Sequence, residues 1–244
     1  MNKGYVRILG IRIDKLTNQG AYNKFLTFFD EKGTKTIYTP NTEIVMKAQE
    51  DEELKEVLEN GDMIIPDGIG LIYASKIYGL GLSERVTGID MMEKMLDYCN
   101  KTGKSIFILG GKPGVAETAM MNIQSQYSNI LSAGTMDGFF SEDEELKVVD
   151  KINESKCDIL FVALGAPKQE KWIAKYQKVL TASVAIGVGG CVDVWSGNAK
   201  RAPQVFIKLG LEWFYRLLTD PRRIFRMMAI PKFIVKVLIT RNKG

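Results

Sequence analysis

The segment Ile106-Phe-Ile-Leu-Gly-Gly-Lys-Pro-Gly114 is the part of this chain that best indicates its fold class. Four consecutive apolar residues end in paired glycines, and a helical pattern follows from Val115 to Tyr127. A second apolar run, Ile159–Leu164, stands further along the chain and also leads into a helical pattern. Continuous apolar runs are typical of strands that are covered on both faces, as in parallel sheets. The segment therefore predicts a parallel sheet with helices on both faces.

Outside this segment, short strand patterns alternate with helical ones along the chain. The expected strands are Val6–Ile11, Thr36–Tyr38, Met63–Ile65, Ser105–Leu109, Ile159–Leu164 and Ser183–Val188. The expected helices are Asn18–Phe29, Thr42–Gln49, Glu52–Glu59, Ile89–Lys101, Val115–Tyr127, Glu142–Glu154 and Gln169–Tyr176. We expect Gly103 to end one helix and Ser141 to cap another. The alternation predicts a Rossmann-like, mostly parallel α/β domain over residues 1–202 and a C-terminal helical appendage over residues 203–244.

The amino-acid composition removes several kinds of chemistry. The 244 residues include no histidine, which excludes a Ser-His-Asp triad and a histidine-based zinc site. The three cysteines are far apart and form no C-x-x-C pair, so we expect small core residues in a reducing cytosol. No G-x-G-x-x-G and no D-x-D follows a predicted strand. We therefore expect no cofactor and no metal, and a general base drawn from Asp, Glu, Lys, Tyr or Cys.

The C-terminal segment from Gly210 to Gly244 has a charge unlike that of the rest of the chain. It holds eight basic residues against Glu212 and Asp220, a net charge of +6, whereas the whole chain carries only +4. Aromatic and aliphatic residues are interleaved with these cations, which is typical of an interfacial helix on an anionic membrane surface. The alternative is a helix that packs on its own domain or on a partner subunit of a homo-oligomer. A nucleic-acid partner would more often require a basic body, so we expect none.

We expect no membrane-spanning segment in this sequence. Arg7, Arg12 and Lys15 stand near the N-terminus with no apolar stretch of the kind found in a signal peptide. No stretch reaches the roughly 18 uncharged apolar residues that a membrane span needs. The predicted location is therefore the cytoplasm, with peripheral attachment to the inner face of the cell membrane.

Two charged residues stand close after a short apolar strand. Asp67 follows Met63–Ile65 directly, within a Pro-Asp-Gly sequence that is also a common turn. In a parallel sheet, ligands bind at the carboxyl ends of the strands, and without histidine this carboxylate is the leading candidate for a general base. Arg85 could bind phosphate through two parallel hydrogen bonds, or form an ordinary surface ion pair.

The other strand ends carry candidate ligand-binding groups. Thr39 and Asn41 could contact a sugar, although Asn41 or Thr42 could instead cap the following helix. Gly110 and Gly111 could allow a diphosphate to approach a helix N-terminus, or could form no more than a tight turn. Further candidates follow the last two predicted strands. These are Gln169 in the first turn of a helix, Gly189, and Asp193 as an acceptor for ribose hydroxyls.

Together these segments resemble the WecG/TagA/CpsF glycosyltransferase family over nearly the whole chain. The resemblance is carried, in chain order, by Thr39-Pro-Asn41, Pro66-Asp-Gly68, Arg85-Val-Thr-Gly88, Leu109-Gly-Gly111, Gly165-Ala-Pro-Lys-Gln-Glu170, Gly187-Val-Gly-Gly190 and Asp193. Each motif alone is weak, but their joint occurrence is highly specific. The likeness is greatest to the TagA type, which acts in synthesis of the wall teichoic acid linkage unit.

The resemblance implies a reaction as well as a fold. It implies transfer of N-acetylmannosamine from UDP-N-acetylmannosamine to N-acetylglucosaminyl-diphospho-undecaprenol, with inversion, to give a β-1,4 bond without a required metal. It assigns Asp67 as the base and places Thr39 and Asn41 in the pocket. It assigns Arg85 and Gln169 to the diphosphate or sugar, and Asp193 to the nucleoside.

The alternatives left open are another UDP-sugar donor, a nucleotide-binding enzyme such as a dehydrogenase, and a non-catalytic membrane scaffold.

The loops supply few cations for a doubly charged leaving group. We therefore expect a tail arginine, namely Arg216, Arg223 or Arg226, to close over the site when the protein docks on a membrane.

Overall fold

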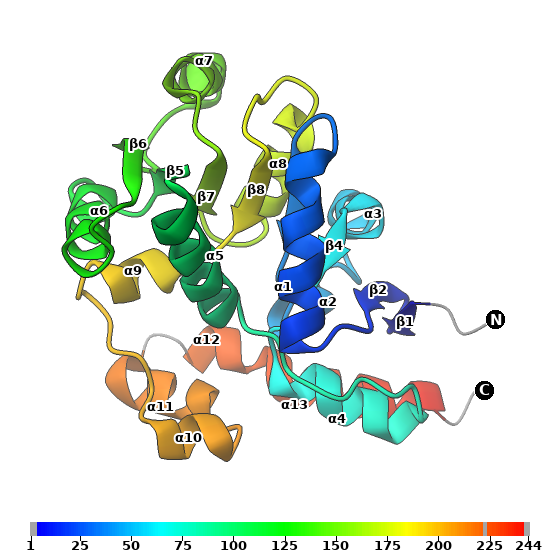
Figure 1. Ribbon diagram of the computed structural model, residues 1–244. Helices are drawn as coiled ribbons and strands as arrows, with labels where there is room; N and C mark the ends of the chain where they lie inside the picture. The colour runs from blue at the N-terminus through cyan, green and yellow to red at the C-terminus, as the bar shows by residue number, and fades with distance from the viewer. Residues whose placement is uncertain (1–3, 222–223, 242–244) are drawn as a thin grey trace.

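A six-stranded parallel sheet lies at the centre of the computed structural model, which describes residues 4–221 and 224–241 (Figure 1). Its strand order is β4-β3-β8-β7-β5-β6, and every neighbouring pair is parallel. The strands are β3 (Lys35–Tyr38), β4 (Met63–Ile64), β5 (Ser105–Gly110), β6 (Leu131–Met136), β7 (Ile159–Ala163) and β8 (Val184–Gly187). The predicted α/β class and parallel sheet are thus confirmed.

Helices cover both faces of the sheet, as the sequence predicts. One face packs against α1 (Asn18–Thr27), α5 (Gly88–Thr102), α6 (Val115–Gln126) and α9 (Cys191–Trp195). The other face packs against α2 (Thr42–Lys47), α3 (Glu52–Asn60), α4 (Ile69–Tyr78), α7 (Glu145–Ser155) and α8 (Lys168–Tyr176). Two short 3₁₀ turns, Phe28–Asp30 and Glu142–Glu144, precede or extend these helices.

The central strands show why their sequences are apolar without interruption. In β5, Ile106 and Ile108 belong to the core on one face, whereas Phe107 and Leu109 belong to the core on the other. All four side chains are almost completely buried. Because side chains alternate between faces along a strand, a sheet with two covered faces requires apolar residues at every position.

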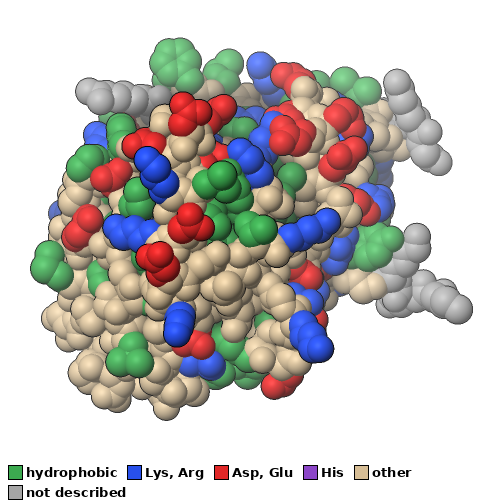
Figure 2. Space-filling model, turned by 90° about the horizontal axis from the view of Figure 1, so that it is seen from above, with side chains coloured by type: hydrophobic (Ala, Val, Ile, Leu, Met, Phe, Trp, Pro, Cys, Tyr) green, Lys and Arg blue, Asp and Glu red, His purple; other side chains and the backbone are tan. Residues whose placement is uncertain are grey.

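The end of the molecule at the amino ends of the strands has a mixed surface. Figure 2 views this end and shows acidic and basic side chains interspersed, with apolar groups between them. The helices after residue 203 lie at the opposite end, below the sheet in Figure 1.

The described residues of the C-terminal segment form four α-helices, which lie against the domain. They are α10 (Gln204–Lys208), α11 (Glu212–Thr219), α12 (Ile224–Met227) and α13 (Ala229–Arg241). Helix α13 packs on α2 and α4. Its Phe233 and Val237 are buried in the same core cluster as residues of the sheet. The division of the chain after residue 202 stays a prediction. The sequence left open that a tail helix packs on its own domain, and α13 does so.

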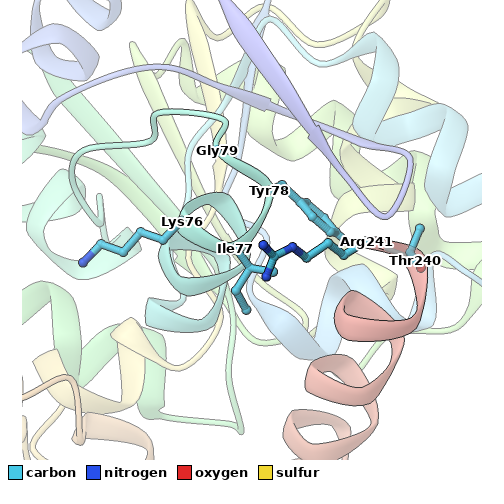
Figure 3. A pocket seen from close by; sticks show the side chains of 6 residues that line it. All are labelled: Lys76, Ile77, Tyr78, Gly79, Thr240 and Arg241. Carbon is cyan, nitrogen blue, oxygen red and sulfur yellow. The ribbon is translucent and has the colours of Figure 1, made fainter. Parts of the chain in front are cut away.

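Helices α4 and α13 are also joined by polar atoms. The Tyr78 hydroxyl donates to the backbone oxygen of Val237 at 3.1 Å. A hollow of about 590 Å³ opens beside this contact, lined by Lys76–Gly79 and by Thr240 and Arg241 (Figure 3). The hollow is lined by the ends of the two helices and by none of the candidate site residues.

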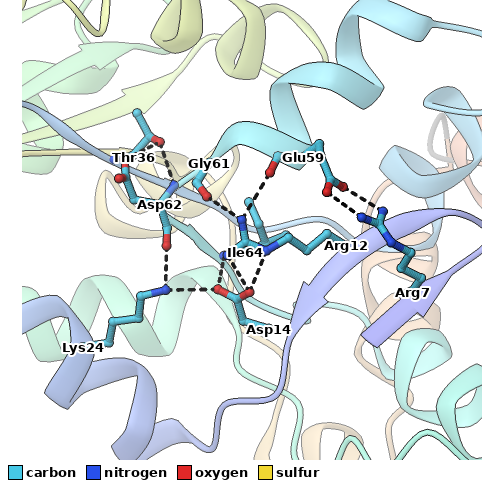
Figure 4. Close-up of polar contacts among 9 residues, drawn as sticks. All are labelled: Arg7, Arg12, Asp14, Lys24, Thr36, Glu59, Gly61, Asp62 and Ile64. Carbon is cyan, nitrogen blue, oxygen red and sulfur yellow. Dashed lines mark hydrogen bonds and ion pairs between the residues drawn. The ribbon is translucent and has the colours of Figure 1, made fainter. Parts of the chain in front are cut away.

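The N-terminal segment is a hairpin, so the prediction of one strand over Val6–Ile11 is wrong. Strands β1 (Tyr5–Ile8) and β2 (Ile11–Asp14) pair antiparallel around a turn in which Leu9 and Gly10 have positive φ. The turn lies inside an apolar run, which is why the sequence was interpreted as one continuous strand. Asp14 holds the hairpin on edge strand β4, because its carboxylate accepts from Ile64 N at 3.2 Å (Figure 4).

Other expectations about the elements have mixed outcomes. As predicted, Gly103 ends α5 in the left-handed conformation. Ser141 caps the 3₁₀ turn that leads into α7, also as predicted, and the Glu144 carboxylate accepts a hydrogen bond from the Ser141 N–H. Strand β6 and helix α4 were not expected. β6 is a half-exposed edge strand that lacks an apolar run. Pro231 lies in the first turn of α13, where its missing N–H costs no hydrogen bond.

Phe233 is expected to anchor the tail to the domain. Replacing Phe233, which is 2% exposed, by alanine should lower the free energy of unfolding by roughly 3–5 kcal/mol through loss of apolar burial and the cavity left behind. The matched control is Ile234→Ala on the same helix, where the side chain is 48% exposed, with an expected cost below about 1 kcal/mol. Urea unfolding measures both values, and equal costs would contradict the packing of α13.

Candidate active site

The loops that follow five strands meet at one edge of the sheet. They are the loops after β3, β4, β5, β7 and β8, and most candidate residues before the tail lie in them or in the first turns of the helices that follow, whereas Arg85 lies in the loop between α4 and α5. The chain passes from β5 outward to β6 and then returns to β7 on the other side of β5. Such a reversal of strand order is where α/β sheets form a crevice for ligands. The fold thus brings together residues that are far apart in sequence.

Asp67 is held between two of these loops. Its backbone N–H donates to the Pro40 oxygen at 3.1 Å, and its side-chain Oδ1 accepts from the backbone N–H of Gly88 at 3.0 Å. Gly88 is the first residue of α5, whose free N–H groups favour a carboxylate. The Pro-Asp-Gly segment is therefore the connection from β4 to α4 rather than a hairpin turn.

The electrostatic surroundings of Asp67 favour its protonated form. Burial raises the pKa of this half-buried carboxyl group to about 6, with a smaller contribution from the nearby Glu212 carboxylate. The Gly88 hydrogen bond and the cations Arg216 and Arg85 oppose that shift. A carboxylate with a pKa near 6 is a better base at neutral pH than an ordinary aspartate, and it is still ionised there.

Arg85 forms an ion pair, although not the exposed surface pair that the sequence left open. Its guanidinium lies 3.3 Å from Glu212 of α11, and both side chains are largely buried. Glu212 also pairs with Arg216 at 2.6 Å. The start of α11, from Glu212 to Arg216, thus lies over the part of the sheet edge that holds Asp67.

The other two tail candidates differ from Arg216. Arg226 pairs with Glu43 of α2 at 2.9 Å and is half exposed. Arg223 lies outside the described residues. A role for these two arginines at the site therefore stays a prediction.

Thr39 and Asn41 lie next to Asp67. The Thr39 hydroxyl donates to the Gly187 oxygen at 3.1 Å and is buried. Asn41 caps α2, because its Oδ1 accepts from Ile44 N at 3.1 Å, so the capping alternative is confirmed. Its Cβ lies only 3.2 Å from where a Cβ at Gly68 would stand, which places Asn41 against the Asp67 loop.

Gly110 and Gly111 form a tight connection beside β7. A Cβ at Gly110 would lie 2.4 Å from the carbonyl carbon of Ala163, so only glycine fits between these strands. The Gly111 N–H donates to the Ala163 oxygen at 3.1 Å. These contacts explain the glycines structurally, and a contact with phosphate stays a prediction.

Gln169 packs against the loop that follows β8. It is 3% exposed, so it does not face solvent, and its Nε2 donates to Oε1 of Glu170 at 2.8 Å. Its side chain fills the space above Gly187 and approaches Gly189. Asp193 follows in α9 and is half-buried, with its backbone oxygen bonded to Ala199 N.

Several residues of this edge received no role in the analysis of the sequence, although Gly88 and Glu170 stand in the motifs quoted there. Glu212, Gly88, Cys191 and the buried Glu170 all lie among the candidates. The spacing of Glu212 and Arg216, four residues apart, was a usable sign of a helical ion pair. Nothing in the sequence indicated that Arg85 would join it.

Among residues 4–221 and 224–241, no group of three or more His, Cys, Asp or Glu side chains is placed to hold a metal ion. The independence from metal that the resemblance implies stays a prediction.

The sequence matches a known protein family over nearly its whole length. The model of the "Glycosyl transferase WecG/TagA/CpsF family" matches residues 6–244. The chain belongs to this glycosyltransferase family. The predicted family and the predicted class of enzyme are thus confirmed, and the candidate residues lie within the matched range.

Three similar proteins illustrate the relationship. The chain is 42% identical over 211 residues to a Bacillus subtilis protein, which is 86% of this chain and 82% of that one. It is 41% identical over 212 residues to a Bacillus spizizenii protein, covering 87% and 82%. It is 35% identical over 244 residues to a Staphylococcus aureus protein, covering 99% and 95%. Each is named N-acetylglucosaminyldiphosphoundecaprenol N-acetyl-beta-D-mannosaminyltransferase.

The pKa of Asp67 has a consequence for stability. Because the folded chain binds this proton more tightly than the unfolded chain, ionisation of Asp67 lowers stability as the pH rises from about 4 to about 6. Asp67→Asn should therefore unfold with a free energy roughly 1–3 kcal/mol higher than the wild type at pH 8. At pH 4 the two proteins should be equally stable.

Urea unfolding at both pH values measures this difference. Asp97→Asn is the control, since Asp97 forms an exposed pair with Lys101 on α5 and should change little between the two conditions. An Asp67→Asn protein that is less stable than the wild type at pH 8 would show that the cations outweigh burial.

Proposed function

We propose that this glycosyltransferase moves N-acetylmannosamine from UDP-N-acetylmannosamine to N-acetylglucosaminyl-diphospho-undecaprenol. The product would carry a β-1,4 bond, formed with inversion, in synthesis of the wall teichoic acid linkage unit. The names of the relatives at 35–42% identity support the acceptor and the transferred sugar. The single structural observation that carries the chemistry is Asp67, a half-buried carboxylate at the carboxyl edge of the sheet with Arg85 and Arg216 nearby.

In this mechanism Asp67 removes the proton from the attacking hydroxyl of the acceptor. Inversion requires one base on the face opposite the leaving group and a stabilised leaving group. The Gly88 hydrogen bond orients the carboxylate by occupying its Oδ1, which leaves Oδ2 for the acceptor hydroxyl.

The leaving nucleotide diphosphate needs positive charge as its bond to the sugar breaks. Guanidinium groups bind phosphate oxygens through paired N–H donors, and Arg85 and Arg216 lie near Asp67. Thr39 and Asn41 would line the sugar pocket beside the base. Gly110, Gly111, Gln169, Gly189 and Asp193 would contact the rest of the nucleotide sugar, after movement of the loop that covers Gln169.

Asp67→Asn should lose transfer while it retains the nucleotide. General-base catalysis contributes roughly 10²–10⁴-fold, so kcat should fall by that factor with UDP affinity within about twofold of wild type. In the wild type, kcat/KM should rise with pH and level off above about 6, as the pKa of Asp67 requires. The assay is transfer from UDP-N-acetylmannosamine to a lipid-diphosphate N-acetylglucosamine analogue, with and without EDTA.

Glu59→Gln is the control, since Glu59 pairs with Arg7 on the surface, remote from the candidate residues. Near-normal turnover of Asp67→Asn would overturn the assignment of the base. Loss of wild-type activity in EDTA would refute metal independence. Absence of any product would contradict the proposed reaction.

We also propose that the tail docks this enzyme on the inner face of the cell membrane, where a polyprenyl-linked acceptor resides. In the described part of the chain no helix is long and apolar enough to cross a membrane. Helix α13 exposes a stripe of aliphatic side chains next to its buried face, and α10–α12 add to this surface. The large apolar residues exposed after residue 203 are Val205, Leu209, Leu211, Phe214, Leu218, Ile224, Phe225, Met228, Ile234, Val235, Leu238 and Ile239.

Charging the exposed stripe should prevent docking. The double change Ile234→Glu and Leu238→Glu replaces two half-exposed apolar side chains with anions, so co-sedimentation with vesicles rich in phosphatidylglycerol should fall at least roughly tenfold. Met121→Glu is the control, because Met121 is also an exposed apolar side chain but lies on α6, outside the tail. Binding of the wild type should weaken in high salt, and unchanged sedimentation of the double variant would exclude α13 as the docking surface.

A further inference from the structure

The carboxylate of Glu212 is shared between two arginines that come from different parts of the chain. Its Oε2 lies 3.3 Å from Arg85, in the loop before α5, and its Oε1 lies 2.6 Å from Arg216, one turn further along α11. The side chain of Glu212 is only 12% exposed, and that of Arg85 only 15%. A pair with this little access to water is screened far less than a surface ion pair.

These three groups and Asp67 form a set with no net charge. Two carboxylates, Asp67 and Glu212, face two guanidinium groups, and all three partners act on the charge of Asp67. The cations that would stabilise a departing diphosphate are therefore already neutralised by a protein carboxylate. A nucleotide diphosphate that reached this set would meet a carboxylate of its own sign between the two arginines.

The two oxygens of Glu212 resemble the oxygens of a diphosphate in what they accept. Oε1 of Glu212 accepts an N–H from Arg216, and Oε2 forms an ion pair with Arg85. A diphosphate likewise offers oxygens on two linked phosphorus atoms, and guanidinium groups bind such oxygens as readily as carboxylates. Both anions cannot be held at once without like-charge repulsion, so one must leave.

We propose that Glu212 is a specificity-determining residue that occupies the diphosphate subsite of the ligand-free enzyme and competes with the nucleotide for Arg85 and Arg216. This inference rests on the proposed function, because it takes these arginines as the diphosphate site. A ligand gains the two cations only if it carries enough negative charge to displace the carboxylate. A neutral nucleoside leaves the Glu212 pairs intact.

The test is the affinity of the full-length protein for UDP, measured by titration calorimetry in wild type and in Glu212→Gln. The amide can still accept a hydrogen bond from one arginine, but it no longer carries the competing charge. We expect UDP to bind roughly 10-fold more tightly to the variant, whereas the affinity for uridine stays the same. The control is Glu145→Gln, a carboxylate of similar exposure that pairs with Lys175 between α7 and α8, and it should leave both affinities unchanged.

A double-mutant cycle with Arg216→Gln separates competition from a structural role. Arg216→Gln should weaken UDP binding, and the gain from Glu212→Gln should be smaller in that background, because one of the two contested cations is gone. If Glu212 only held α11 in place, Glu212→Gln would bind UDP equally or more weakly, and that result overturns the inference. An equal gain in both backgrounds overturns it as well.

The proposed function and this inference fail in different ways. If Glu212→Gln tightens UDP binding but the wild type transfers no sugar, the reaction is wrong and the inference stands. If the wild type transfers sugar but the affinity of Glu212→Gln does not increase, the inference alone is wrong. Absence of UDP binding by the wild type overturns both.

Discussion

Burial of the sheet on both faces is the constraint on which the rest of this structure depends. With Ile106, Phe107 and their neighbours enclosed between two layers of helices, neither face of the sheet can hold a polar ligand. Polar and charged groups are then confined to the strand ends, where backbone N–H groups and loops are available. The carboxyl edge gains the free N–H groups of helices such as α5, and Asp67 uses one of them. The position of the site therefore follows from the burial of the core.

The same constraint decides how much could be predicted from sequence. Runs such as Ile159–Leu164 indicate buried parallel strands directly, and residues just after each run must share an edge. The candidates that follow a strand could therefore be brought together without coordinates, whereas Arg85 follows the unexpected helix α4. Local rules do not predict pairing across the chain. The contact of Arg85 with Glu212 depends on how the tail packs, and the half-exposed strand β6 has no apolar run. The first hairpin was missed because its turn lies within an apolar sequence.

Asp67 shows how the fold adjusts a residue that sequence reasoning could only nominate. An isolated aspartate is a weak base at neutral pH because its pKa is too low. Partial burial raises the pKa of Asp67, whereas the Gly88 N–H and two arginines limit that rise, so the group stays ionised near pH 7 and yet attracts a proton more strongly. Burial without the Gly88 hydrogen bond and the two arginines would raise the pKa of Asp67 further, and full exposure would produce an ordinary carboxylate. The intermediate position at the sheet edge gives the combination that a base requires.

The tail links the apolar core to this charged set. Phe233 and Val237 join the core beside α2 and α4, and that apolar contact holds α13 on the domain. Helix α11 belongs to the same segment, and Glu212 ties it to Arg85 of the domain. Apolar packing does not depend on the charge of a ligand, whereas the Glu212 pairs respond to an anion that carries enough negative charge to displace the carboxylate. The segment can therefore stay attached through α13 while α11 adjusts to the ligand. This arrangement requires the anchor and the contacts with the site to lie on different helices, and in this chain they lie on α13 and α11.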